Sequence, residues 1–186
     1  MLPFEGKTII FGVSKVFGLN ELFESELKAL GFNTIDISFH THNFKYRNVF
    51  QRIEKLIAKH FFAQNSYKQV LDFRRNKQDL EQKLAQVEHA DYILITRPDM
   101  YPIDFIKKLR EKGGKMVAYQ WDGLERFPKI VDYIHLFDRF FVFDGKDLIT
   151  PSVMPMTNFY PDSFGHKQLF DEAFRSQIVY SGSYSR

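Results

Sequence analysis

Short apolar runs alternate with amphipathic segments along most of the chain. Runs rich in β-branched and aromatic residues occur at residues 7–13, 32–37, 92–96, 116–119, 139–143 and 152–156. Between several of these runs, apolar residues recur every three or four positions, as at Leu22, Phe23, Leu27 and Leu30. Short apolar runs joined by helices are typical of buried parallel strands. The pattern therefore predicts an α/β fold: a Rossmann-like, doubly wound, mostly parallel sheet with flanking helices. If the strand order is 2-1-3-4-5, it reverses between the first and third strands.

Two residues mark the expected ends of the first helix. Asn20 precedes the first helical pattern, and Gly31 follows it. Asn is a favoured N-cap residue, and Gly is the usual residue just after a helix C-terminus. We therefore expect Asn20 to cap this helix and Gly31 to end it.

The segment at about residues 38–76 interrupts the alternation, because it is long, basic and aromatic and has no clear strand pattern. From position 45 to position 77 the chain carries nine Lys or Arg residues and two acidic residues. Helical spacing at about 45–62 predicts a helical insertion after the second strand. Its basic character suits an acceptor bearing phosphates or a membrane surface, and a solvated helical face is the alternative.

The pattern divides the chain into three parts. Residues 1–156 carry the strand and helix alternation and are predicted to form an N-terminal domain. Residues 157–176 have a looser pattern and are predicted to be a linker. A new β-rich run then leads into a Gly and Ser loop, so we expect residues 177–186 to be the start of a missing second Rossmann-like domain.

Composition excludes several classes of protein. Hydrophobic residues make up 44% of the 186 positions and charged residues 26%, which fits a globular protein rather than a disordered one. No apolar run approaches the roughly 18–20 residues that cross a bilayer, and the N-terminus lacks a secretory pattern, so we expect a cytoplasmic protein. The absence of cysteine excludes disulfides, thiol nucleophiles and Cys-type zinc sites. A net charge of +3 is too small to indicate a partner.

Candidate functional residues fall where the predicted strands end. Ligands of open α/β sheets bind at the carboxyl ends of the strands, at the point where the strand order reverses. Arg97 follows the third strand and is suited to hold an anionic group through both arms of its guanidinium. Asp99 and Asp122 are candidate bases that take a proton from a hydroxyl nucleophile. A helix cap is the alternative role for either carboxylate.

Three further residues are candidate substrate contacts. Ser14 and Lys15 lie between the first strand and the first helix, where backbone amides favour an anion, although a tight structural turn is the alternative. Trp121 follows the fourth strand next to a carboxylate, which suggests a polar, ring-shaped ligand. A tryptophan that only covers the sheet edge explains the same pattern.

Several familiar site motifs are absent from the sequence. The loop after the first strand matches neither the dinucleotide-binding nor the triphosphate-binding glycine pattern, so we expect no nicotinamide or other cofactor. There is no nucleophile-elbow motif. His40 and His42 have the spacing to face one side of an extended segment, but no third ligand follows at a recognisable distance, so no metal site is predicted.

Four segments in order resemble the N-terminal half of GT-B glycosyltransferases of the spore-maturation and lipopolysaccharide-biosynthesis kind. In that family a strand runs into a Trp-Asp pair, and a strand of the FDRFFVFD type follows. An Asn-Phe-Tyr-Pro segment and a VYSGSYS-like start of the second domain come next. These features correspond here to residues 119–128, 137–144, 158–162 and 178–185. The resemblance covers roughly residues 7–186 and is strongest from Tyr92 onward.

The resemblance implies two Rossmann-like domains with a cleft between them and sugar transfer without an obligatory metal. The N-terminal domain would bind a glycan or lipid-linked acceptor, and the C-terminal domain, missing here, would bind the nucleotide-sugar. This chain would then be the acceptor-binding half of an enzyme that builds a surface polysaccharide or lipid-linked glycan of the cell envelope. On its own the chain would be inactive.

Two other functions remain open. One is a non-catalytic Rossmann-like binding or protein-interaction module. The other is nucleic-acid binding through the basic segment, which we rank low because its aromatic residues have the spacing of a buried helix face.

Overall fold

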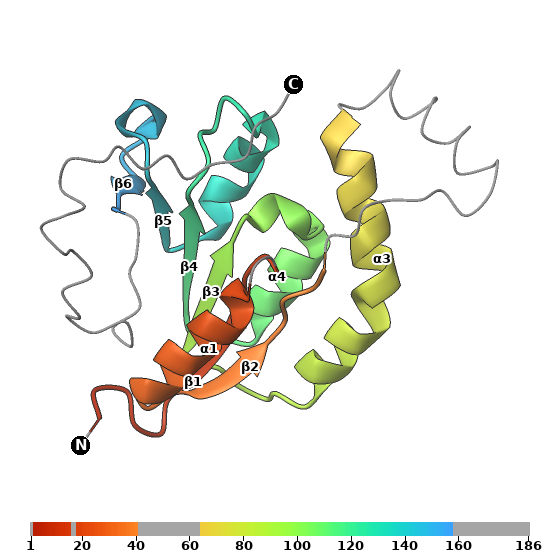
Figure 1. Ribbon diagram of the computed structural model, residues 1–186, viewed down its shortest axis with the longest axis vertical. Coiled ribbons are helices and arrows are strands. Elements are labelled where there is room, and N and C mark those ends of the chain that lie inside the picture. Colours follow the sequence, from red (N-terminus) through yellow and green to blue (C-terminus); the bar gives the residue numbers. More distant parts are fainter. Residues whose placement is uncertain (1, 16–17, 41–63, 158–186) are drawn as a thin grey trace, which may run out of the picture.

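The computed structural model describes residues 2–15, 18–40 and 64–157, and these form a six-stranded, all-parallel sheet (Figure 1). The strand order is β2-β1-β3-β4-β5-β6. The strands are β1 (Thr8–Gly12), β2 (Asn33–Asp36), β3 (Tyr92–Thr96), β4 (Lys115–Gln120), β5 (Arg139–Val142) and β6 (Val153–Pro155). The fold is Rossmann-like, which confirms the predicted class, and the first five strands have the order 2-1-3-4-5.

Helices cover both faces of the sheet because the central strands are apolar on both sides. Helix α1 (Leu19–Ala29) lies over one face, where Leu27 packs with Ile9, Phe11 and Val13 of the β1 region. The other face is covered by α3 (Gln64–Ala85), α4 (Ile103–Glu111) and the 3₁₀ helix η2 (Pro128–Leu136). Two 3₁₀ turns, η1 (Pro98–Met100) and η3 (Gly145–Asp147), follow β3 and β5.

The start of α1 differs from the prediction. Gly18, in the left-handed conformation with φ of 73°, occupies the N-cap position, so Asn20 is not the cap. Asn20 lies inside the first turn, where it is buried, and its amide donates to the Asp36 carboxylate at 3.5 Å. Glycine adopts a positive φ without the steric cost that a Cβ imposes, which explains why it takes this position. Gly31 follows the helix end as expected.

Helix α3 runs past residue 76, where the predicted insertion was expected to end. Its sequence contains no Gly or Pro to stop a helix, and Leu71, Phe73, Leu80 and Leu84 are all buried. The last residues of the predicted insertion therefore belong to a helix that continues to Ala85. Three predictions fall outside the described residues. They are the helix at about 45–62, the linker from residue 158 to residue 176, and the start of a second domain at 177–186. No helix in the described part of the chain is both long enough and apolar enough to cross a membrane.

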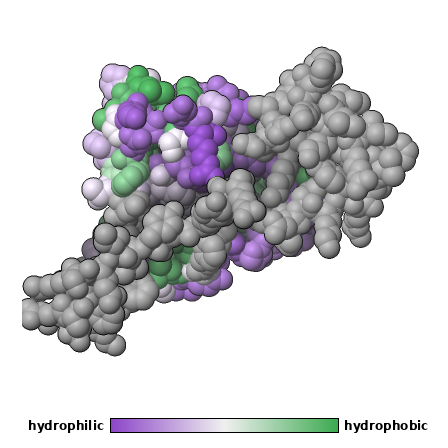
Figure 2. All heavy atoms as spheres, turned by 45° about the horizontal axis from the view of Figure 1, so that its top comes forward, coloured by the Kyte–Doolittle hydropathy of each residue, from purple (hydrophilic) through white to green (hydrophobic). Residues whose placement is uncertain are grey.

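Strand register brings the carboxyl ends of β3 and β4 together. Thr96 pairs with Tyr119, so the residues that follow each strand emerge next to one another. Figure 2 is turned to bring this edge forward, and it shows mainly hydrophilic residues with smaller apolar areas on the described surface. The candidate residues after β3 and β4 therefore share one polar edge.

The turn before β4 requires glycine at position 114, and this requirement can be tested. Gly114 has φ of 76°, and a Cβ there would overlap the carbonyl oxygens of Ala90 and Asp91. Gly114→Ala should lower the free energy of unfolding by at least about 2 kcal/mol, because a left-handed residue with a Cβ already costs ~1–2 kcal/mol before any overlap. Urea denaturation measures this change.

Gly145→Ala is the matched control, since a Cβ at Gly145 meets nothing within 4 Å. It should change the unfolding free energy by less than about 0.5 kcal/mol. Equal losses in the two variants would contradict the assigned turn geometry.

Candidate functional site

The site begins at Arg97, the first residue after β3. Arg97 has φ of 54° and is the one non-glycine residue with a positive φ in the described ranges. Its backbone N–H donates to the Tyr119 carbonyl at 3.4 Å, which extends the pairing of β3 with β4 by one residue. A left-handed non-glycine residue costs of order 1–3 kcal/mol and persists only where its surroundings enforce it.

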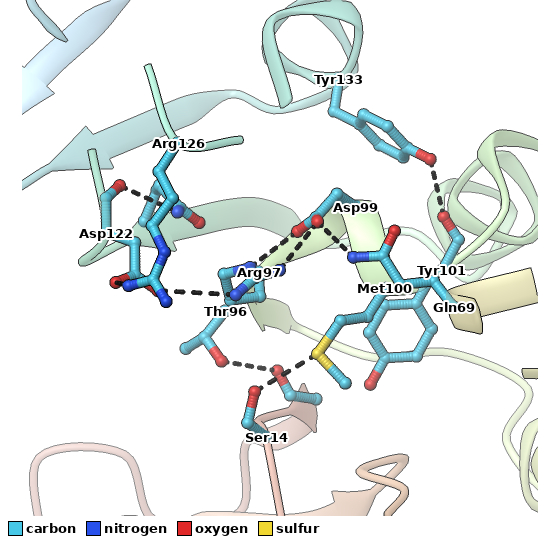
Figure 3. Close-up of polar contacts among 12 residues, drawn as sticks. Ser14, Gln69, Thr96, Arg97, Asp99, Met100, Tyr101, Asp122, Arg126 and Tyr133 are labelled. Carbon is cyan, nitrogen blue, oxygen red and sulfur yellow. Dashed lines mark hydrogen bonds and ion pairs between the residues drawn. The ribbon is translucent and has the colours of Figure 1, made fainter. Parts of the chain in front are cut away.

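The Arg97 side chain supplies that enforcement through a bidentate ion pair. Its Nε donates to Asp99 Oδ1 at 2.9 Å, and its Nη2 donates to Asp99 Oδ2 at 2.9 Å (Figure 3). The carbon of the guanidinium lies 3.6 Å from the centroid of the Phe127 ring. The Arg97 and Asp99 side chains are only 14% and 6% exposed, so this pair is shielded from water. Arg97 is therefore held on its edge by a carboxylate and on its face by a ring.

The two candidate bases differ in how much freedom they keep. Asp99 Oδ2 also accepts a hydrogen bond from the Gln69 amide at 2.6 Å, so both oxygens of Asp99 are engaged. Asp122 accepts from Arg97 Nη1 at 3.5 Å and from Arg126 Nη1 at 3.2 Å, and its side chain is 27% exposed. Of the two carboxylates, Asp122 is the more exposed to solvent.

A pocket of about 230 Å³ lies beside Asp99, between η1, η2 and α3. Its polar wall residues include two carboxylates, an amine, an amide and two phenols. The lining consists of Gln69, Asp99, Met100, Tyr101, Pro102, Ile103, Lys129, Asp132 and Tyr133. The volume is below the roughly 300–1,000 Å³ of pockets for drug-sized ligands, so it suits one small polar ring.

Two phenols form a fixed wall of this pocket. The Tyr133 hydroxyl donates to the Tyr101 carbonyl at 2.9 Å, and the Tyr101 hydroxyl donates to the Ile37 carbonyl at 3.1 Å. Burial, and then the charges of Asp99 and Asp132, raise the pKa of Tyr133 to about 12. Burial also raises the pKa of Tyr101. Both phenols stay protonated at neutral pH and act as hydrogen-bond donors, not as bases.

Ser14 and Lys15 occupy the neighbouring strand end. The Ser14 hydroxyl contacts Met100 Sδ at 3.3 Å, which brings Ser14 to the same edge as Asp99 (Figure 3). Lys15 Nζ lies 3.8 Å from Asp36 Oδ2, toward β2 and away from the Arg97 pair. Residues 16–17 lie outside the described ranges, so the proposed anion-binding turn is only partly described.

Trp121 lies on the opposite face of the sheet from the pocket. It packs against the apolar cluster under α1, and its ring meets the Tyr119 ring edge-on with centroids 5.9 Å apart. The pocket is lined from the other face. The arrangement fits the alternative role for Trp121, which is to cover the sheet edge, and does not place the ring against a ligand in this pocket.

The described residues contain no group of three or more His, Asp or Glu side chains that is arranged to hold a metal ion. His40 is exposed, and His42 lies outside the described residues. Within the described ranges, no side-chain set offers a metal centre for the chemistry of this edge.

Sequence patterns missed several residues of the site. The sequence predicted no site role for Phe127 or Arg126, and it placed Gln69 in the basic insertion. Arg126 stands four positions after Asp122, which is a spacing that favours ion pairs in helices, but the segment between them is not helical. Nothing in the sequence connected Gln69 to Asp99, because their contact joins α3 to η1 across 30 positions.

No protein-family model, no curated protein and no solved structure matches the chain. The resemblance to GT-B glycosyltransferases therefore stays a prediction, and the geometry of the site is what supports a function.

The different burial of the two carboxylates predicts different effects on stability. Asp99→Asn should lower the free energy of unfolding by about 3 kcal/mol, because it leaves a buried guanidinium without its main partner. Asp122→Asn should lower it by less than about 1 kcal/mol, because its ion pairs are partly exposed. Chemical denaturation of both variants under one set of conditions measures the difference. A loss from Asp122→Asn as large as that from Asp99→Asn would refute this division.

Proposed function

We propose that this chain is the acceptor-binding half of a glycosyltransferase that transfers a sugar from a nucleotide-sugar to a surface polysaccharide or lipid-linked glycan. One observation carries the proposal. A partly exposed carboxylate, Asp122, and a sugar-sized polar pocket beside Asp99 lie on the same edge of a Rossmann-like sheet. The order of segments in the sequence supports the same assignment.

Asp122 is the proposed general base. Its carboxylate accepts the proton of an acceptor hydroxyl, whose oxygen forms a bond to the anomeric carbon of the donor sugar. The bond from that carbon to the nucleotide diphosphate breaks, and the diphosphate leaves with the bonding electrons. Asp122 suits this role because solvent reaches 27% of its side chain, whereas the side chain of Asp99 is only 6% exposed.

Asp99 and Arg97 therefore have a positioning role in this proposal. Arg97 was predicted to bind an anionic group, but Asp99 already occupies both arms of its guanidinium. An anion would have to displace a buried carboxylate to reach those arms. Arg97 instead holds Asp99 at the pocket and orients Asp122 through Nη1.

The pocket is the proposed place for one ring of the acceptor. Asp99 and Asp132 offer acceptors for sugar hydroxyl groups, and the fixed wall beside Tyr133 limits the size of the ligand. A polyhydroxyl ligand pairs with the hydrogen-bonding groups around this cavity. An apolar ligand would leave them unpaired and would bind more weakly.

The remaining partners follow from the resemblance and stay part of the proposal. A second Rossmann-like domain supplies the nucleotide-sugar. The basic segment near 45–77 associates with phosphates of the acceptor or with the membrane surface. The protein works in the cytoplasm, peripheral to the inner membrane face, where cell-envelope glycans such as lipopolysaccharide are built.

A non-catalytic interaction module is the second candidate function. Its support is a set of large apolar side chains that stay exposed around β5 and β6: Phe143, Leu148, Ile149 and Met154. If these side chains form one patch, that patch would suit a protein contact. Self-association that is lost on replacing Phe143 and Ile149 with Ser would favour this function.

The pocket gives the first test of acceptor binding. Asp132→Asn should weaken the binding of acceptor oligosaccharides to the isolated chain by about tenfold, because it removes a charged hydrogen-bond acceptor from the pocket wall. Saturation-transfer NMR with a panel of oligosaccharides measures the affinity. Asp79→Asn is the matched control, since Asp79 is an exposed carboxylate on α3 outside the pocket lining. If the two substitutions act equally, the pocket is not the acceptor site.

Catalysis is tested in a polypeptide that also carries the nucleotide-sugar domain. Asp122→Asn should lower kcat for sugar transfer by about 10²–10⁴-fold, because the amide cannot take the hydroxyl proton. The acceptor KM should change much less, because Asp122 does not line the pocket. An unchanged kcat would remove Asp122 from the mechanism.

A further inference from the structure

Arg126 is an exposed cation at the same edge. It lies between β4 and η2, and its side chain is 73% exposed. Its Nη1 contacts Asp122 Oδ1 at 3.2 Å, and its guanidinium carbon lies 5.3 Å from the centroid of the Phe127 ring. Among the described residues these are its side-chain contacts, so most of the guanidinium faces solvent.

Arg126 and Arg97 converge on one carboxylate from two directions. Asp122 Oδ1 accepts from Arg126, and Asp122 Oδ2 accepts from Arg97 Nη1 at 3.5 Å (Figure 3). Two guanidinium groups aimed at one point form an anion site, and in this structure a carboxylate of the chain itself fills that site. The contact with Arg126 is the one that breaks more easily, because it is the more exposed.

We propose that Arg126 binds a phosphate group of a ligand and leaves Asp122 in order to do so. The planar guanidinium fork matches phosphate oxygens in a bidentate geometry, whereas its contact with Asp122 uses one nitrogen. Arg97 stays in place because Asp99 and Phe127 hold it. Phosphate binding therefore releases Asp122 Oδ1 from its ion pair and opens this oxygen to another group.

This inference goes beyond the proposed function and does not need it. A phosphate site at Arg126 exists whether or not the chain takes part in sugar transfer. Failure of the transfer assay would leave phosphate affinity intact, and loss of phosphate affinity would leave the acceptor pocket and Asp132 unaffected. The two ideas are therefore tested separately.

The test is a titration of the chain with inorganic phosphate at a constant ionic strength of about 0.15 M. Binding is followed by isothermal calorimetry and by the fluorescence of Trp121, the only tryptophan and the immediate neighbour of Asp122. Arg126→Gln should weaken phosphate binding by about tenfold or more, because it removes a charged donor pair. Arg139→Gln is the matched control, since Arg139 is an exposed arginine at the opposite, N-terminal end of β5, and it should leave the affinity unchanged.

A second pair of variants tests the displacement of Asp122. Asp122→Asn should tighten phosphate binding roughly two- to fivefold, because phosphate no longer competes with a carboxylate for Arg126. Asp79→Asn removes the same charge at an exposed position on α3, and at this ionic strength it should have a smaller effect. Weaker binding in Asp122→Asn would overturn the displacement.

The source of the phosphate is distinguished by two further probes. Binding of glucose 1-phosphate that is lost in Arg126→Gln indicates a soluble phosphorylated ligand. Sedimentation with vesicles of phosphatidylcholine and phosphatidic acid that is lost in Arg126→Gln indicates a lipid headgroup. Absence of wild-type binding to inorganic phosphate and to both probes at millimolar concentrations overturns the proposal, and so does equal binding by Arg126→Gln.

Discussion

The bidentate pair between Arg97 and Asp99 is the interaction on which the polar edge of this protein depends. It joins two residues that are only two positions apart, and it closes the turn that leads from β3 into η1. A backbone with positive φ at Arg97 turns the side chain back over that turn. The contacts of the guanidinium offset the energetic cost of this backbone geometry. Asp99 binds its edge, the Phe127 ring packs on its face, and Asp122 contacts Nη1. Burial makes the pair obligatory, because neither charge can be left there alone.

The parallel pairing of β3 and β4 connects the ion pair of Arg97 and Asp99 to other parts of the site. Since the two strands end side by side, Asp122 emerges close enough to share the guanidinium of Arg97. Gln69 then connects Asp99 to α3, a helix on the pocket side of the sheet. The walls of the pocket are rigid for a related reason, because Tyr101 is fully buried, stacks on Phe105 and donates to the Ile37 carbonyl. A small polar cavity is thus held between groups whose own contacts are already satisfied.

Sequence periodicity was sufficient for the sheet, because buried parallel strands are short apolar runs and their order follows from the alternation with helices. It was also sufficient to place Arg97, Asp99 and Asp122 on one edge. It could not assign their partners. Arg97 turns toward Asp99 rather than toward a ligand because its backbone has a left-handed φ. This conformation is uncommon in residues other than glycine, so the sequence did not predict it. Trp121 falls on the face under α1 because of the pleat of β4, which a short apolar run does not reveal. Asn20 is a residue type that often caps helices, but Gly18 is better suited to the left-handed conformation that this turn requires.

The same physical argument assigns different roles to the two arginines that flank Asp122. A guanidinium that is 14% exposed and shares its arms with a buried carboxylate is fixed, since moving it would uncover an unpaired charge. A guanidinium that is 73% exposed and meets Asp122 through one nitrogen can exchange partners at little cost, since water replaces what it loses. Asp122 lies between the two arginines, so its contact with the exposed Arg126 is the one that can break. On the proposed exchange of partners by Arg126, Arg97 would still orient the carboxylate through Oδ2, and Oδ1 would become open. A carboxylate oriented through one oxygen and open at the other would suit the proposed proton transfer from a bound hydroxyl.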